Sequence, residues 1–247
     1  MENEKAAPGA YPQTGVASTC RSFDEYGAMF KLEPSDWTGP VLDVAGGAAS
    51  FTASLHAKGV QAVAADPWYG GDADEIAASG FAELKTASDK VARMADQFDW
   101  SYYGSPEGQR ALRERSLALF AEDFRKADAG TRYVAAALPD LPFADDTFGL
   151  VLCSHFLFLY ADQFDEDFHL AALRELIRVT RPGGQVRIYP LVTLKWERCF
   201  FVEKLVDELR DVAEHAYIPS GLPFIPVRSP LLQLLKKTGR AGGKARD

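Results

Sequence analysis

The chain has 247 residues, which suits one domain with an elaboration, and its 47% hydrophobic and 25% charged residues are close to the average for globular proteins. A formal net charge of -8 argues against a broad phosphate-binding surface, and therefore against a nucleic-acid partner. There is no apolar run long enough for a membrane span, no secretory signal and no close pair of cysteines, so we expect a cytoplasmic protein without a membrane partner, disulfides or a metal site.

The N-terminal residues 1–21 are rich in Ala, Pro, Gly and Gln, and we expect them to form a flexible segment. Ser22-Phe23-Asp24-Glu25 is a capping box, which predicts a helix that begins after Ser22. A single domain is then expected over residues 22–247.

Residues 41–51, with the sequence VLDVAGGAASF, predict a buried strand, a tight turn and the start of a helix. The turn consists of small residues, so a ligand can approach its backbone closely. A second strand is predicted over 60–65, and it ends at Asp66-Pro67. A strand, a helix and a strand in this order form a βαβ unit, which predicts a parallel sheet with a right-handed crossover.

Residues 68–130 contain no strand pattern and predict a helical cap inserted after the second strand. Helices are expected over 74–78, 82–97 and 106–126. An ordinary crossover between parallel strands needs only about a dozen residues, so this insertion is large.

After the insertion the alternation of strands and helices resumes. Strands are predicted over 133–138, 150–154 and 185–191, and helices over 165–180 and 196–214. Residues 216–227 are a candidate for one more strand, whereas Ser229-Pro230 followed by LLQLLKK predicts a short capped helix. The end of the chain, 228–247, is expected to be a basic tail. The predicted fold is therefore α/β, a Rossmann-like, doubly wound and mainly parallel sheet with a helical insertion.

Three features are expected at one edge of this sheet, where open α/β sheets bind their ligands. They are the small-residue turn, Asp66 and the segment LPDLPFADDTFGLVLCSH at 138–155. With R-P-G-G at 181–184, these features resemble the class I S-adenosylmethionine-dependent methyltransferases, especially the ubiquinone and menaquinone methyltransferase branch. The family pattern D-x-G-x-G-x-G stands here as D-V-A-G-G-A-A. Ala45 and Ala49 replace the outer glycines, and alanine disfavours a positive φ.

The resemblance implies S-adenosylmethionine as cofactor and a small-molecule methyl acceptor beneath the insertion. It assigns the ribose hydroxyls to Asp66, the region of the methionine amino group to Asp43, and the adenine to Pro67 and Trp68. Ala137 stands where the family often has an adenine-binding Asp. The full predicted set of cofactor-binding residues is Asp43, Ala45, Gly46, Gly47, Asp66, Pro67, Trp68, Ala137, Leu138 and Ser154.

His155 follows the fourth strand and is the candidate catalytic residue, because a neutral imidazole there could take a proton from a hydroxyl or amine acceptor. The alternative is a histidine that lines the pocket without proton transfer.

Two other functions stay open. The missing glycines and the missing adenine Asp also fit a protein that binds S-adenosylmethionine with weak turnover. A glycine turn followed about 20 residues later by an acid also occurs in NAD-binding Rossmann oxidoreductases, although the G-x-G-x-x-G register fails here. Neither the acceptor nor the oligomeric state follows from the sequence.

Overall fold

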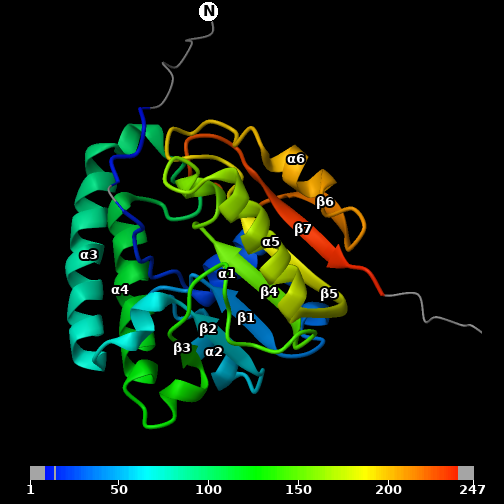
Figure 1. Ribbon diagram of the computed structural model, residues 1–247. Coiled ribbons are helices and arrows are strands. Elements are labelled where there is room, and N and C mark those ends of the chain that lie inside the picture. The colour runs from blue at the N-terminus through cyan, green and yellow to red at the C-terminus, as the bar shows by residue number, and fades with distance from the viewer. Residues whose placement is uncertain (1–8, 14, 239–247) are drawn as a thin grey trace, which may run out of the picture.

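The computed structural model describes residues 9–13 and 15–238, and a seven-stranded sheet forms its centre (Figure 1). The strand order is β3-β2-β1-β4-β5-β7-β6. Neighbours from β3 to β5 pair in parallel, whereas β7 is antiparallel to both β5 and β6. This confirms the predicted Rossmann-like, mainly parallel sheet. The strands are β1 (Val41–Val44), β2 (Ala62–Ala65), β3 (Tyr133–Val134), β4 (Phe148–Ser154), β5 (Thr180–Tyr189), β6 (Ala213–Pro219) and β7 (Pro230–Lys236).

Helices cover both faces of the sheet. The α-helices are α1 (Phe23–Phe30), α2 (Phe51–Ala57), α3 (Ala73–Arg93), α4 (Pro106–Phe124), α5 (Glu166–Val179) and α6 (Val202–Asp207). Short 3-10 helices are η1 (Pro34–Asp36), η2 (Pro67–Gly70), η3 (Ala95–Gln97), η4 (Ala129–Thr131) and η5 (Phe158–Tyr160). Among these described helices, none is long and apolar enough to cross a membrane.

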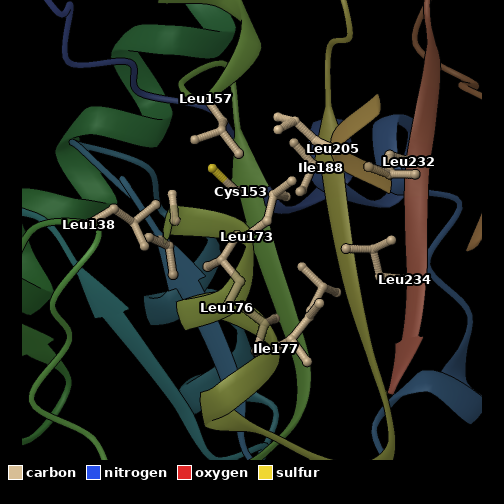
Figure 2. Close-up of a cluster of buried hydrophobic side chains, with 14 of the residues drawn as sticks. Leu138, Cys153, Leu157, Leu173, Leu176, Ile177, Ile188, Leu205, Leu232 and Leu234 are labelled. Atoms are coloured by element: carbon tan, nitrogen blue, oxygen red, sulfur yellow. The ribbon is translucent and has the colours of Figure 1, made fainter. Parts of the chain in front are cut away.

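Strand β4 shows why helices cover both faces of the sheet. Its residues Val151 and Cys153 belong to a cluster with α5 and α6, which Figure 2 shows in close-up. The alternate residues Leu150 and Leu152 belong to a second cluster with α1 and α2. Successive side chains of a strand point to opposite faces, so a continuous apolar run is buried on both sides, as is typical of parallel sheets.

The residues between β2 and β3 that the structure describes form helices and no strand, and α3 and α4 lie side by side (Figure 1). Two helices, over 74–78 and 82–97, were predicted where α3 is continuous. Helix α3 continues through Gly80, because this glycine packs closely against α4 and does not end the helix. A Cβ at Gly80 would lie 3.0 Å from Leu117 Cδ1 of α4 and 3.3 Å from Trp68 Cη2.

The prediction of a short helix after Ser229 is wrong, because residues 230–236 form strand β7 between β5 and β6. Leu232 packs in the cluster of α5 and α6, while Leu231 packs in that of α1 and α2, so both faces of β7 are buried. This pairing outweighs the local helix propensity of LLQLLKK. Pro230 is the first residue of the strand, a position that tolerates proline. Part of the expected basic tail is thus in the sheet, and residues 239–247 lie outside the described part of the chain.

The bounds of other helices and strands also differ from the predicted ones. The helix predicted over 196–214 is only α6, and the strand predicted over 133–138 is only Tyr133–Val134. Strand β5 begins at Thr180, directly after α5 and ahead of the predicted residue 185.

The segment ahead of α1 was predicted to be flexible up to residue 21. Its described residues form no helix or strand, yet Cys20 and Arg21 are buried. Thr19 O accepts a hydrogen bond from the Ala48 N–H (3.1 Å), and Arg21 O accepts one from the Ser50 N–H (3.1 Å). Residues 17–21, which we call the N-terminal strap, therefore run along the turn between β1 and α2.

Candidate functional site

The turn between β1 and α2 has an unusual backbone. Ala45 has φ 56° and Gly47 has φ 52°. The sequence predicted that alanine would avoid a positive φ, so Ala45 corrects that expectation. A left-handed residue other than glycine costs about 1–3 kcal/mol, and such residues concentrate at functional sites. Ala45 thus preserves the turn conformation that a glycine would give.

Asp43 is buried at the end of β1, where its partner is Tyr26 of α1. The Tyr26 hydroxyl lies 3.1 Å from Oδ1 and 3.0 Å from Oδ2 of Asp43. Burial raises the pKa of Asp43 to about 8; the Tyr26 hydrogen bond opposes this rise and the charge of Asp66 adds to it. Asp43 is therefore largely protonated at neutral pH. Its carboxyl group lies beside Gly46 at the start of the turn. No sequence pattern singles out Tyr26.

Asp66 joins the turn to the end of β2. Its Oδ2 accepts a hydrogen bond from the Gly47 N–H (3.0 Å), and its Oδ1 accepts one from the Trp68 N–H (2.9 Å). Burial raises the pKa of Asp66, while these two backbone bonds lower it. A carboxylate can accept about four hydrogen bonds, so Asp66 keeps capacity for a ligand.

Gly46 and Gly47 lie where side chains would not fit. A Cβ on Gly46 would lie 2.8 Å from Tyr69 Oη and 3.1 Å from Asp43 Oδ2. A Cβ on Gly47 would lie 2.9 Å from Ser18 Oγ. The turn is thus in close contact with Tyr69 on one side and with the N-terminal strap on the other.

The other predicted cofactor residues lie around this centre. Pro67 and Ala137 are exposed, and Leu138 is buried in the cluster of Figure 2. The ring of Trp68 stacks on Phe120 of α4, with 6.2 Å between ring centroids, so it packs against the helical insertion.

A cavity of about 420 Å3 lies between the N-terminal strap, α3, α4 and the loop after β4. Of the predicted site residues, only His155 lines it. The strap residues line the cavity on one side and contact the turn at Gly47 on the other. The strap therefore borders both the cavity and the predicted cofactor turn.

His155 is buried on the cavity wall and has φ 50°, a second strained position. Its Nδ1 lies 3.1 Å from Ser154 Oγ, whose hydroxyl donates to the Met29 sulfur at 3.7 Å. If this hydroxyl donates to sulfur, its oxygen accepts the Nδ1 proton and Nε2 stays free as an acceptor. Burial lowers the pKa of His155 well below its ordinary value, and the charges of Arg21 and Arg113 add to this effect. The imidazole is thus neutral at physiological pH.

A buried charge cluster that no sequence pattern signals includes two residues of the same wall, Arg21 and Arg113, together with Glu25 and Tyr103 behind them. Arg113 Nη2 lies 2.7 Å from Glu25 Oε1, and Arg21 Nη1 lies 3.7 Å from the same oxygen. The Tyr103 hydroxyl donates to Glu25 Oε1 at 2.6 Å. In the sequence, Glu25 had a visible role only as the last residue of the capping box. In the described part of the chain, no group of three His, Cys, Asp or Glu residues could hold a metal ion.

Comparisons with known proteins add to this geometry. Residues 111–188 match the family model of a methyltransferase domain. The uncharacterized protein MJ0045 of Methanocaldococcus jannaschii is 30% identical over 212 residues, which are 84% of this chain and 94% of that protein.

Similar solved structures have low identity. A Thermus thermophilus 16S rRNA N2 G1207 methyltransferase is 14% identical, with a TM-score of 0.41, over 87% of this chain; the chain spans only 39% of its length. A Burkholderia thailandensis 1,6-didemethyltoxoflavin-N1-methyltransferase is 16% identical, with a TM-score of 0.40, over 81% of this chain and 71% of that one. A TehB-like methyltransferase from Corynebacterium glutamicum is 13% identical, with a TM-score of 0.42, over 81% of this chain and 80% of that one.

Proposed function

Because the chain belongs to the class I S-adenosylmethionine-dependent methyltransferases, we propose that it methylates a small molecule held in the cavity under α3 and α4. The observation that carries this proposal is the cavity itself, which has a volume of about 420 Å3 and is lined by His155 at the carboxyl end of β4. Ligands of open α/β sheets bind at this edge. The net charge of -8 supports a small acceptor over a nucleic acid.

The residues around the turn fit the cofactor. Asp66 has unused acceptor capacity for the ribose hydroxyls, and the backbone of 45–47 would hold the methionine end. Asp43 would act as a positioning residue, since its carboxyl group is buried against Tyr26. The N-terminal strap contacts Gly47, so we propose that it also contacts the bound cofactor.

When bound, S-adenosylmethionine would supply a methyl group on a sulfonium, with S-adenosylhomocysteine as the leaving group. The protein's own contribution is to hold the acceptor in line and to receive a proton where the acceptor is a hydroxyl or an amine. His155 Nε2 is the proposed proton acceptor. Its lowered basicity suits an acceptor group that is itself acidic.

Two alternatives can be compared with this proposal. The family membership sets aside a nicotinamide-dependent oxidoreductase. A weakly active binder was suggested by the alanines of the turn, but Ala45 adopts the left-handed conformation that glycine would supply. The alanine at position 45 therefore does not prevent a left-handed turn.

Two measurements test the proposal. Titration calorimetry should detect binding of S-adenosylhomocysteine and no binding of NAD. Incubation with methyl-labelled S-adenosylmethionine and a cell extract that contains both metabolites and RNA should place label in a small-molecule fraction. Label found only in RNA would contradict the small-molecule acceptor, and binding without any labelled product would support the weakly active alternative.

A further inference from the structure

The cavity wall carries two buried guanidinium groups that share a single carboxylate. The side chains of Arg21 and Arg113 are each 6% exposed, and that of Glu25 is 0% exposed. Arg113 is close enough to Glu25 for a charge-assisted hydrogen bond at 2.7 Å, whereas Arg21 is 3.7 Å away. Arg113 thus forms the close ion pair with Glu25, and Arg21 is only a distant partner of the same carboxylate.

Among the described residues around the cavity, no other group offsets this excess charge. Tyr103 stays neutral because burial raises its pKa, and His155 is neutral for the reason given above. Two further charged residues line the cavity, Glu83 and Lys90. Glu83 accepts the Ser18 N–H at 3.0 Å, and Lys90 donates to Gln13 Oε1 at 3.2 Å. The cluster of Arg21, Arg113 and Glu25 therefore carries one net positive charge.

The same guanidinium groups have donors without acceptors. Nε and Nη1 of Arg21, and Nη1 of Arg113, are buried and make no hydrogen bond to residues that the structure describes. Leaving a buried charged donor unpaired is costly, so such groups normally have a partner. Guanidinium groups bind carboxylates in a fixed fork geometry, which makes a carboxylate a suitable partner for these donors.

The rest of the cavity is mainly apolar. Phe98, Trp196, Leu159, Leu194 and Phe224 line it. A ligand that fills the cavity would therefore combine one anionic group with an apolar or aromatic body.

We propose that the methyl acceptor is a monoanionic carboxylate with an apolar body, and that Arg21 and Arg113 bind its carboxylate. This inference rests on the proposed function, because it identifies the class of acceptor. The cofactor is a poorer candidate for the same site. S-adenosylmethionine carries a sulfonium, an ammonium and a carboxylate, so its net charge is positive, and none of the predicted turn residues Ala45, Gly46 and Gly47 lines the cavity.

The test uses a pair of ligands of equal shape and different charge. Dissociation constants of 2-naphthoate and 2-naphthamide are measured by calorimetry on the full chain, with S-adenosylhomocysteine present at saturation. The wild type should bind the carboxylate about tenfold more tightly than the amide, as expected for charge-assisted hydrogen bonds. Arg21→Met should abolish this preference, because it removes the excess charge and leaves the Arg113–Glu25 pair intact.

Arg110→Met is the matched control, because Arg110 lies on the same helix, α4, with an exposed side chain that pairs with Glu114. It should keep the preference for the carboxylate. Arg21→Lys should restore part of the preference that Arg21→Met loses, because it retains the charge without the fork.

The outcomes separate the two proposals. Absence of S-adenosylhomocysteine binding in the wild type would overturn the proposed function and the acceptor role with it. Normal binding of S-adenosylhomocysteine with equal constants for the two naphthyl ligands would overturn only the present inference. A loss of S-adenosylhomocysteine affinity in Arg21→Met with an unchanged carboxylate preference would overturn it too, since the guanidinium would then hold the cofactor.

Discussion

The hydroxyl of Tyr26 contacts both carboxyl oxygens of Asp43, at 3.1 and 3.0 Å, and so ties helix α1 to the end of β1 directly beneath the small-residue turn. Replacing Tyr26 by Phe removes this bond but retains the stacking on Phe51, where the ring centroids are 4.3 Å apart. We expect the free energy of unfolding to fall by about 1–3 kcal/mol, the usual cost of leaving a buried acceptor unpaired. Urea denaturation measures the change. An unchanged midpoint would mean that another group forms a hydrogen bond with the Asp43 carboxyl group in the variant.

Asp43 also makes stability depend on pH. Its pKa in the folded protein is raised to about 8, whereas in the unfolded chain it is about 4. Between these values the folded state binds more protons than the unfolded state, so stability falls as pH rises through this window. Asp43→Asn should remove this contribution. Unfolding free energies at pH 5 and pH 8 should then differ less in the variant than in the wild type, and equal differences would contradict the raised pKa.

Asp66→Ala tests the predicted ribose contact. We expect S-adenosylhomocysteine affinity to fall by roughly 1–3 kcal/mol, because the ribose hydroxyls lose their acceptor. Stability should fall as well, since the amides of Gly47 and Trp68 lose theirs. Asp72→Ala is the control: Asp72 caps the start of α3, so the variant should lose stability without losing affinity. Equal affinities for Asp66→Ala and the wild type would refute the assignment.

Gly47→Ala and Gly59→Ala form a matched pair. Both glycines have a positive φ, but a Cβ on Gly47 would meet Ser18 and Thr19, whereas a Cβ on Gly59 would meet nothing within 4 Å. Both variants should lose about 1–3 kcal/mol of stability through backbone strain. Only Gly47→Ala should also weaken S-adenosylhomocysteine binding, because it pushes the N-terminal strap away from the turn. Calorimetry on the two variants decides whether this contact matters for binding.

His155 leads to a prediction about the pH profile of turnover. Its pKa lies well below the ordinary value, so the imidazole stays neutral from pH 6 to pH 8. The ratio of wild-type to His155→Gln turnover should therefore be constant over this range. A ratio that declines toward pH 6 would indicate a histidine with an ordinary pKa, of about 6.5.

The parts of the molecule that are local in sequence could be predicted from it. The β1 strand, the small-residue turn and Asp66 lie within 26 consecutive positions, 41–66, and the structure brings them together. Strand β7 could not be predicted, because its pairing with β5 and β6 is set by tertiary contacts, and LLQLLKK by itself favours a helix. The buried cluster of Arg21, Glu25 and Arg113 could not be predicted either. It forms only because α4 of the insertion packs beside the start of α1, and no sequence spacing signals that contact.

The position of the N-terminal strap bears on how the enzyme can be shortened. The capping box at Ser22 marks an attractive place to begin a minimal domain, since regular structure starts there. A chain cut at that point would lose Arg21 from the cavity and Thr19 O from the Ala48 amide. The wall that the strap supplies to both the cavity and the turn would be lost, so neither the acceptor site nor the cofactor site would keep its full lining. We therefore expect such a trimmed protein to retain the sheet and its two clusters while losing selectivity for both ligands.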